Sequence, residues 1–214
     1  MTRDETSVPM RRLAIVAYSD YVCPWCYIGL QRIERLQQEY PVDVEWRPFE
    51  LHPETPRGGA QLVGRHGSSA RAAAYANNIL ALARDAGLEM RMPVVVANSH
   101  LSLEAAEFAR EHGGFDAYHS ALFRAYFEGA RDIGDPDVLC DIARACGVND
   151  QGLRQALADG TFREQVDRIT EEARADEVMS TPTFIFEGGF RMTGAQDYDV
   201  FASITSRLLS RLGN

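Results

Sequence analysis

The sequence predicts an α/β fold in which a large helical segment interrupts a small sheet domain. The chain opens with the pattern of a strand, a helix and a second strand, and it closes with that of two short strands and a helix. Between these halves, residues 53–178 are mostly helical in pattern. A connection of that length cannot be a loop within one compact sheet domain, so we expect an inserted helical domain. The expected division of the chain is 1–52, 53–178 and 179–214.

Two apolar runs and the helix between them form the first half of the sheet domain. Arg11 to Ser19 is short, apolar and β-branched at its centre, which is typical of a buried strand. A helix follows and ends before Pro41, because apolar residues repeat there at helical spacing and proline cannot continue a helix. Those residues are Cys26, Leu30, Ile33, Leu36 and Tyr40. Val42 to Leu51 begins with alternating apolar residues, and the order strand, helix, strand favours a parallel pair with a right-handed crossover.

The inserted segment contains a series of predicted helices. Apolar residues recur there at helical spacing, and turn residues separate the runs. The expected helices are Ser69 to Ala86, Ser99 to His112, Phe115 to Glu128, Pro136 to Cys146, and Asp150 to roughly Glu177. Met92 to Ser99 resists this assignment, because Pro93 and a run of valines favour extended chain.

A hairpin and a last helix complete the sheet domain. Thr183 to Phe186 predicts a strand, Gly188-Gly189 supplies a two-residue turn, and Phe190 to Thr193 returns as the partner strand. The helix that follows has an apolar face. That face consists of Phe201, Ile204, Leu208 and Leu212.

Composition and charge argue against several classes of partner. A net charge of −9 and a pI near 5.1 argue against nucleic acid, whose binding rewards clustered positive charge. No apolar run approaches the ~20 residues that a membrane-spanning helix needs. The apolar run Leu13 to Ala17 is also shorter than the ~7–15 residues of a secretory signal. We therefore expect a cytoplasmic protein that binds neither nucleic acid nor membranes.

Two cysteines, Cys23 and Cys26, lie directly after the first apolar run, with Pro24 and Trp25 between them. Pro24 suits the first helical position because its φ is fixed and it lacks an N–H, which puts Cys23 at the N-cap. Unpaired backbone N–H groups and the helix dipole favour a thiolate there. Cys26 lies one turn further in and should be buried and protonated. One exposed thiolate and one shielded thiol are typical of an attacking and a resolving cysteine.

A structural zinc site is the weaker interpretation of this pair. It would require two further ligands, and Cys140 and Cys146 are the obvious candidates. Six residues apart on one helix, they would stand ~9 Å apart along the axis and roughly 120° around it. They can neither share an ion nor form a disulfide, which needs Cα atoms within about 7 Å. We expect both to be buried helix residues. Ligand spacing is also absent from the histidines, which are His52, His66, His100, His112 and His119, so we expect no metal site.

With the CPWC motif and a late Thr-Pro before a strand, the chain resembles the thioredoxin-fold DsbA family, in particular its cytoplasmic FrnE-like branch. The matching segments are "SDYVCPWCYIG", "WRPFELHPETPRGG", "LFRAYFEGARDIGDPDVL" and "TPTFIFEGGFRMTGAQ". The resemblance implies a thioredoxin fold whose helical domain is inserted between the second and third strands. It makes Cys23 the nucleophile and Cys26 the resolving cysteine. It also makes Thr181-Pro182 a cis-proline dipeptide, in which the Thr181 backbone meets an extended substrate.

Two departures from relatives bear on the direction of the reaction. DsbA has a histidine between its cysteines, where Trp25 cannot stabilise a thiolate as a cation. Thioredoxin has a buried acid six residues before its first cysteine, where this chain has Ala17. Asp20 is closer in sequence, and it suits a turn or cap at least as well as a role in proton transfer. We predict a reduction potential between about −270 mV for thioredoxin and about −120 mV for DsbA, and a dithiol resting state.

These features predict a thiol–disulfide oxidoreductase acting on a protein or small-molecule disulfide. Pro24, Trp25, Thr181 and Pro182 would border its substrate groove. No cofactor is required, although glutathione is a possible redox partner. A second hypothesis is a glutathione-dependent isomerase or transferase, because hydroxychromene carboxylate isomerases and kappa-class glutathione transferases share the inserted architecture. Those relatives carry serine at the position of Cys23, and the dithiol here counts against this second hypothesis. A third is a non-enzymatic binding module. Oligomeric state stays open.

Overall fold

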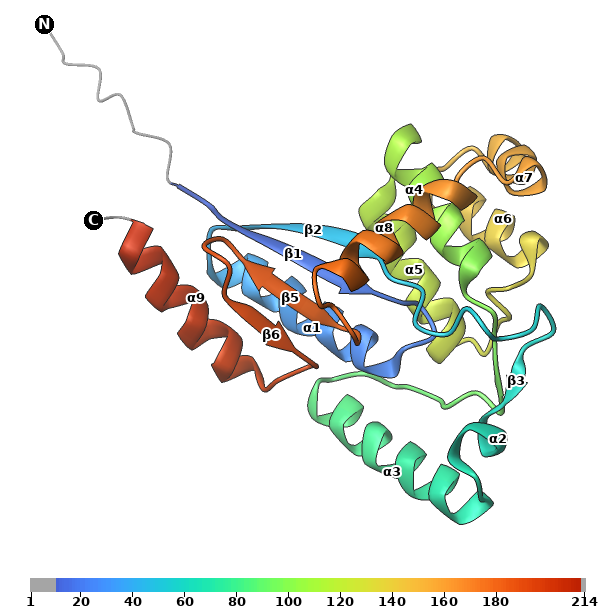
Figure 1. Ribbon diagram of the computed structural model, residues 1–214, viewed down its shortest axis with the longest axis horizontal. Helices are drawn as coiled ribbons and strands as arrows, with labels where there is room; N and C mark the ends of the chain where they lie inside the picture. Colours follow the sequence, from blue (N-terminus) through green and yellow to red (C-terminus); the bar gives the residue numbers. More distant parts are fainter. Residues whose placement is uncertain (1–10, 213–214) are drawn as a thin grey trace, which may run out of the picture.

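The structure, a computed structural model, describes residues 11–212 and contains a four-stranded mixed sheet (Figure 1). Its strands are β1 Leu13–Ser19, β2 Val42–Pro48, β5 Thr183–Phe186 and β6 Arg191–Thr193. They lie in the order β2-β1-β5-β6. β1 pairs in parallel with β2 and antiparallel with β5, which pairs antiparallel with β6. The predicted parallel pair and the predicted hairpin are both confirmed.

Helices lie between the strands of the sheet and after the last of them, as expected. α1, Pro24–Glu39, connects β1 to β2, and α9, Tyr198–Leu212, ends the described chain. The other described helices all lie between β2 and β5: α2 Leu62–His66, α3 Ser69–Asp85, α4 His100–His112, α5 Phe115–Phe127, α6 Pro136–Ala145, α7 Asp150–Asp159 and α8 Arg163–Ala175. The predicted α/β class, with a helical insertion between the second and third strands of the sheet, is confirmed. Within residues 11–212, no helix combines the length and apolarity needed to cross a bilayer.

Successive side chains of β1 face opposite sides of the sheet, and each side has its own helices. Leu13, Ile15 and Ala17 are buried in the large core, which includes residues of α1 and α9. Val16 and Tyr18 lie in a small cluster on the other face, together with residues of α8. The sheet is therefore covered on both faces, which explains why β1 is apolar throughout instead of alternating.

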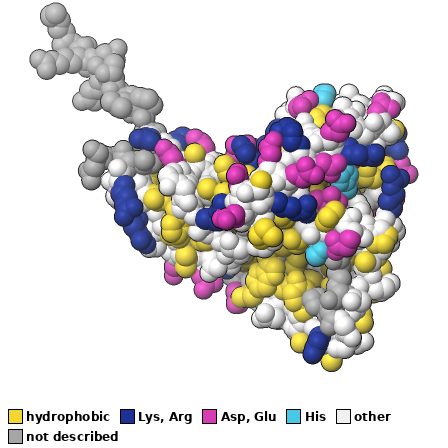
Figure 2. Space-filling model, in the orientation of Figure 1, with side chains coloured by type: hydrophobic (Ala, Val, Ile, Leu, Met, Phe, Trp, Pro, Cys, Tyr) yellow, Lys and Arg dark blue, Asp and Glu magenta, His cyan; other side chains and the backbone are white. Residues whose placement is uncertain are grey.

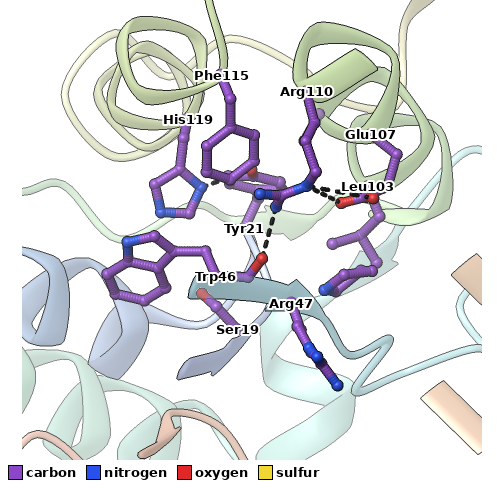
Figure 3. A pocket seen from close by; sticks show the side chains of 11 residues that line it. Ser19, Tyr21, Trp46, Arg47, Leu103, Glu107, Arg110, Phe115 and His119 are labelled. Atoms are coloured by element: carbon purple, nitrogen blue, oxygen red, sulfur yellow. Dashed lines mark hydrogen bonds and ion pairs between the residues drawn. The ribbon is translucent and has the colours of Figure 1, made fainter. Parts of the chain in front are cut away.

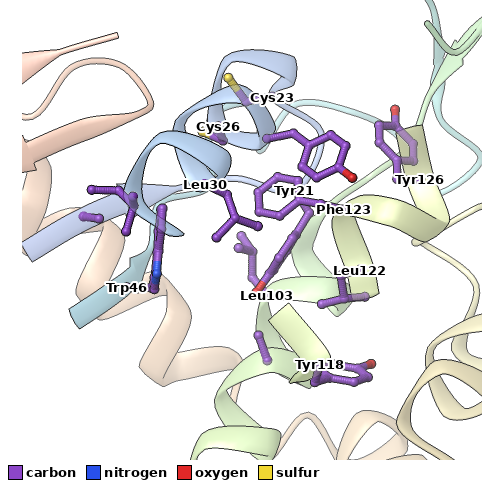
Figure 4. Packing of buried hydrophobic residues seen from close by; sticks show 14 of the residues in the cluster. Tyr21, Cys23, Cys26, Leu30, Trp46, Leu103, Tyr118, Leu122, Phe123 and Tyr126 are labelled. Atoms are coloured by element: carbon purple, nitrogen blue, oxygen red, sulfur yellow. The ribbon is translucent and has the colours of Figure 1, made fainter. Parts of the chain in front are cut away.

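Aromatic side chains join α1 to α5 within the large core. Tyr27 of α1 stacks on Phe123 and Phe127 of α5, with ring centroids 5.4 and 5.8 Å apart. Tyr21, which precedes α1, packs against Phe123 at 4.9 Å. Figure 4 shows Leu30 and Tyr21 on the side of α1 that faces Phe123. The N-terminal half of α1 is thus held between the sheet and the inserted helices.

Two parts of the insertion differ from the prediction. One helix from Asp150 to roughly Glu177 is wrong, because α7 and α8 are separate there. Gly160, with φ 66°, takes the left-handed position that ends α7, and its N–H donates to the carbonyl of Ala156. The extended chain expected over Met92 to Ser99 is confirmed around β4, Val95–Val96, which pairs with an unpredicted strand β3, Ala60–Gln61. Strands of two residues are too short to show a periodicity.

Candidate active site

The cysteines of the CPWC motif lie at the N-terminus of α1. Cys23 is the N-cap residue, with φ −88° and ψ 113°, and Pro24 opens the helix, as predicted. The Cys23 side chain itself forms no capping hydrogen bond. Cys26 is fully buried, as predicted, but Cys23 is only 4% exposed, so the expectation of an exposed first thiol is wrong. The segment before β5 lies against it, with the Thr181 carbonyl oxygen 3.4 Å from its sulfur.

The two thiols differ in acidity. Burial raises the pKa of Cys23, but hydrogen bonding from the side chains of Cys26 and Thr181 and from the Cys26 backbone N–H outweighs burial and lowers this pKa below its ordinary value. Burial also raises the pKa of Cys26, and the hydrogen bond and charge of Cys23 raise it further. Of the two thiols, Cys23 is therefore the one that ionises first, while Cys26 keeps its proton.

The segment before β5 lies against the first cysteine. The Cys23 thiol donates to the carbonyl of Thr181, with 3.4 Å between sulfur and oxygen. The peptide bond between Thr181 and Pro182 is cis, as the resemblance implies. A Cβ on Gly29 would lie 3.3 Å from Pro182 and 3.1 Å from Phe184, so glycine at this position allows α1 to approach the segment closely. The structure thus brings together the two sequence motifs on which the resemblance rests.

Asp20 is fully buried below the turn that leads into α1. Its carboxylate accepts from the N–H of Val22 at 3.3 Å and from the N–H of Leu51 at 2.8 Å, and its carbonyl accepts from the N–H of Cys23 at 3.1 Å. Burial raises the pKa of Asp20 to about 6, and hydrogen bonds from Leu51, Ser99 and Val22 oppose this rise in part. These are the bonds of a turn, and the Asp20 charge raises the pKa of Cys23. Asp20 therefore fixes the geometry before α1 at some cost to the thiolate.

An open cavity of about 490 Å³ lies in front of Cys23. The predicted substrate-binding residues Pro24, Trp25 and Thr181 line this cavity, whereas Pro182 and Cys26 are not among its lining residues. The inserted segment supplies much of the opposite wall, through Leu62, Tyr75, Met92, Pro93 and Val96. Figure 2 shows hydrophobic side chains gathered on this face, between the sheet and α3. The sequence analysis missed this wall, because its residues form no motif and only the fold brings them together.

A second pocket, between β2 and helices α4 and α5, is filled by its own side chains (Figure 3). The Tyr21 hydroxyl and Nδ1 of His119 are 2.7 Å apart, and burial, with a smaller effect of Arg110, lowers the pKa of His119 to about 3. Arg110 lies over the ring of Phe115 and donates to the carbonyl of Trp46. The remaining space is about 10 Å³, room for about one water. This pocket therefore joins the helices to the sheet and is no substrate site.

The other two cysteines show no sign of activation. Cys140 is buried within α6, as predicted, but Cys146 is partly exposed, so the expectation of a buried helix residue is wrong there, because the helix ends and Cys146 is its C-cap residue. Burial raises the pKa of both thiols. Among the side chains that the structure describes, the one group with the geometry of metal donors contains neither of them.

Comparisons with known proteins agree with this geometry. The family model of the DsbA-like thioredoxin domain matches residues 14–205. Over 198 residues, the chain is 31% identical to the uncharacterized protein YwbO of Bacillus subtilis (strain 168), covering 90% of this chain and 95% of that protein.

Solved structures show the same fold. A probable DsbA oxidoreductase from Streptomyces coelicolor superposes with a TM-score of 0.84 and 27% identity, over 92% of this chain and 89% of that one. A 2-hydroxychromene-2-carboxylate isomerase superposes with a TM-score of 0.76 over 94% of this chain and 98% of its own, but at 17% identity this likeness concerns the fold alone. The fold is thus a thioredoxin fold with a helical insertion, and the chain belongs to the DsbA-like thioredoxin domain family.

Proposed function

We propose that the protein is a thiol–disulfide oxidoreductase of the FrnE-like cytoplasmic branch, which exchanges its Cys23–Cys26 dithiol or disulfide with a protein or small-molecule disulfide. Family membership supports an oxidoreductase or a related isomerase. The opposite acidities of the two thiols at the start of α1 carry the finer assignment. A thiolate is the attacking species in disulfide exchange, and a neighbouring thiol that stays protonated attacks only in the second step.

In this proposal, the Cys23 thiolate attacks one sulfur of the substrate disulfide. A mixed disulfide forms, and the other substrate sulfur leaves as a thiolate. The charge on Cys23 is then gone, which removes one of the causes that raise the pKa of Cys26. Cys26 can now lose its proton, which a departing substrate thiolate accepts, and attack the sulfur of Cys23. The second substrate thiolate leaves, so the substrate is reduced and the chain holds the Cys23–Cys26 disulfide.

The cavity supports an extended, partly apolar substrate segment. Pro24 and Trp25 lie on the helix side of the thiol, and Met92 lies on the wall supplied by the insertion. The backbone of Thr181, whose carbonyl oxygen lies 3.4 Å from the sulfur of Cys23, would meet the substrate chain. No cofactor takes part in this reaction. Glutathione would restore the dithiol in the cytoplasm, as an external redox partner.

Trapping the mixed disulfide tests this assignment. In a chain with Cys140→Ser and Cys146→Ser as the matched background, Cys23→Ser should abolish reduction of a model peptide disulfide. Cys26→Ser should instead accumulate a covalent adduct, seen by mass spectrometry at Cys23. Unchanged turnover after Cys23→Ser, or an adduct on any other residue, would refute the assignment.

A glutathione-dependent isomerase is the second candidate, because the cavity of about 490 Å³ falls within the ~300–1,000 Å³ range of small-molecule sites. Such an enzyme would bind glutathione as a cosubstrate and would not need a resolving thiol. The Cys26→Ser variant separates the two candidates. Saturable glutathione binding with full isomerase turnover in that variant would favour the isomerase, whereas arrested turnover and a stable adduct favour the oxidoreductase.

A further inference from the structure

A group of donor side chains lies apart from the CPWC motif, where the chain leaving β2 meets α4 and α8. Glu50 follows β2, His100 is the first residue of α4, and Asp167 lies within α8. One donor atom from each residue lies within 4.8 Å of those of the other two. The three residues come from segments distant in sequence, which is why spacing alone led to the expectation of no metal site.

The imidazole of His100 lies between two buried carboxylates. Its Nδ1 is 3.0 Å from Oε2 of Glu50, and its Nε2 is 3.3 Å from Oε1 of Glu104, one helical turn further along α4. The side chains of Glu50 and Glu104 are 8% and 1% exposed, and that of His100 is 18% exposed. Two acids are thus removed from solvent around a single ring.

These buried groups are not satisfied within the described part of the chain. Nε2 of His100 and Oε1 of Glu104 form an ion pair at 3.3 Å, but neither atom, nor Oε2 of Glu104, has a hydrogen bond of good geometry among residues 11–212. Two buried carboxylates share a single imidazole as their nearest counter-charge, which is costly, so the fold has a reason to hold a further cation here.

We propose that Glu50, His100 and Asp167 bind a divalent transition-metal ion such as Zn²⁺, and that Glu104 orients the imidazole from its other nitrogen. Donor atoms 3.0 Å apart can share an ion at the ~2.0–2.2 Å bond lengths of zinc sites. An imidazole with carboxylates suits zinc or manganese better than the all-oxygen sites of magnesium and calcium. A carboxylate on the second ring nitrogen is the usual partner of a metal-bound histidine.

The position of this site indicates a structural ion. The ion would tie the chain after β2 to α4 and α8, which belong to different parts of the fold. Asp167 is exposed, so one side of the ion would face water. The site does not include Cys23 or Cys26, so Zn²⁺ binding there does not depend on the proposed redox reaction.

Calorimetry with Zn²⁺ alone tests the site. The parent protein is the full chain with Cys23→Ser and Cys26→Ser, stripped with EDTA, so that the paired thiols cannot bind the ion. We expect one Zn²⁺ per chain and a higher melting temperature with Zn²⁺ than with EDTA. His100→Gln should abolish binding, and Glu104→Gln should weaken it by about 10–100-fold. His112→Gln, on the same helix but outside the cluster, should bind as the parent does.

The Asp167→Asn variant distinguishes loss of a ligand from misfolding, because this side chain is exposed and its replacement leaves the buried core intact. It should weaken Zn²⁺ binding while leaving the circular dichroism spectrum and the melting temperature in EDTA unchanged. Two results would overturn the proposal. One is a parent protein that binds no Zn²⁺, which would make the cluster an ion-pair network. The other is binding that His100→Gln and Asp167→Asn leave intact.

Discussion

The thiol of Cys23 donates to the carbonyl of Thr181 across 3.4 Å, although the two residues are 158 positions apart. This bond exists only while Cys23 carries its proton. Ionisation, or a covalent bond to a substrate sulfur, frees the Thr181 carbonyl to accept a hydrogen bond from another group. The backbone acceptor beside the thiol is thus free at the stage of exchange at which a substrate chain would lie next to it.

The acidity of Cys23 depends on the thiol of Cys26. Because Cys26 donates the hydrogen bond that does most to lower the pKa of Cys23, Cys26→Ala should raise that pKa. Cys26→Ser keeps a donor and should raise it less. The rate of iodoacetamide alkylation against pH, with Cys140 and Cys146 replaced by serine, measures the effect. Equal alkylation midpoints for the alanine and serine variants would contradict it.

Asp20 should make stability depend on pH. Its folded pKa, about 6, lies above the unfolded value of about 3.9, so the folded state binds its proton more tightly. The contribution of Asp20 to the free energy of unfolding is therefore greatest below pH ~4 and is lost as the pH rises through 6. The expected loss is about 3 kcal/mol.

Urea unfolding of Asp20→Asn at pH 4 and pH 7 measures this loss as a difference from the parent chain. The amide also changes the turn hydrogen bonds, but that cost is the same at both pH values. Parallel pH profiles for the two proteins would contradict the prediction.

Trp25 should limit the oxidising power of the disulfide. Trp25→His would add a group able to carry positive charge beside the Cys23 thiolate, which stabilises the dithiol and raises the reduction potential. A gain of about 1.4 kcal/mol would correspond to about 30 mV. Equilibration with glutathione buffers measures the potential, and Trp25→Phe is the control for lost indole packing. A histidine variant that is no more oxidising than the phenylalanine variant would rule out this explanation.

The stacked rings between α1 and α5 should contribute strongly to stability. Phe123 is fully buried and contacts both Tyr21 and Tyr27, so Phe123→Ala should lower the free energy of unfolding by about 3–5 kcal/mol. Val94→Ala, at a residue that is 75% exposed, should change it by less than about 0.5 kcal/mol. Chemical denaturation compares the two. A similar effect of both substitutions would show that the insertion does not support α1.

Local sequence patterns predict much of the fold and, within the site, the position of the two cysteines at the start of α1. Strand and helix periodicities predict the sheet and most of the insertion, because those patterns depend on one face being buried. The position of Cys23 follows from the conformational limits of Pro24 and needs no tertiary information. The break at Gly160 was missed, although Asp159-Gly160 is a dipeptide that marks turns, because more weight was given to the helical pattern on both sides of it.

The rest of the site depends on contacts that no local pattern encodes. Tyr75 and Met92 resemble ordinary core residues until the insertion folds back over α1. The burial of Cys23 has the same origin, because the Thr181 carbonyl that lies against its sulfur is 158 residues away in sequence. His100 and Glu104 stand at helical spacing, but their partners Glu50 and Asp167 come from two other segments, and neither shows a ligand motif.

The long separation between Cys23 and Thr181 has a consequence for biosynthesis. A ribosome releases the N-terminal end first, so the start of α1 emerges well before the Thr181 carbonyl that lies beside Cys23 in the folded protein. A nascent chain ending before residue 181 would present a cysteine pair without the acceptor that the finished protein places beside it. The surroundings of the Cys23 thiol are therefore complete only after residue 181 has been translated.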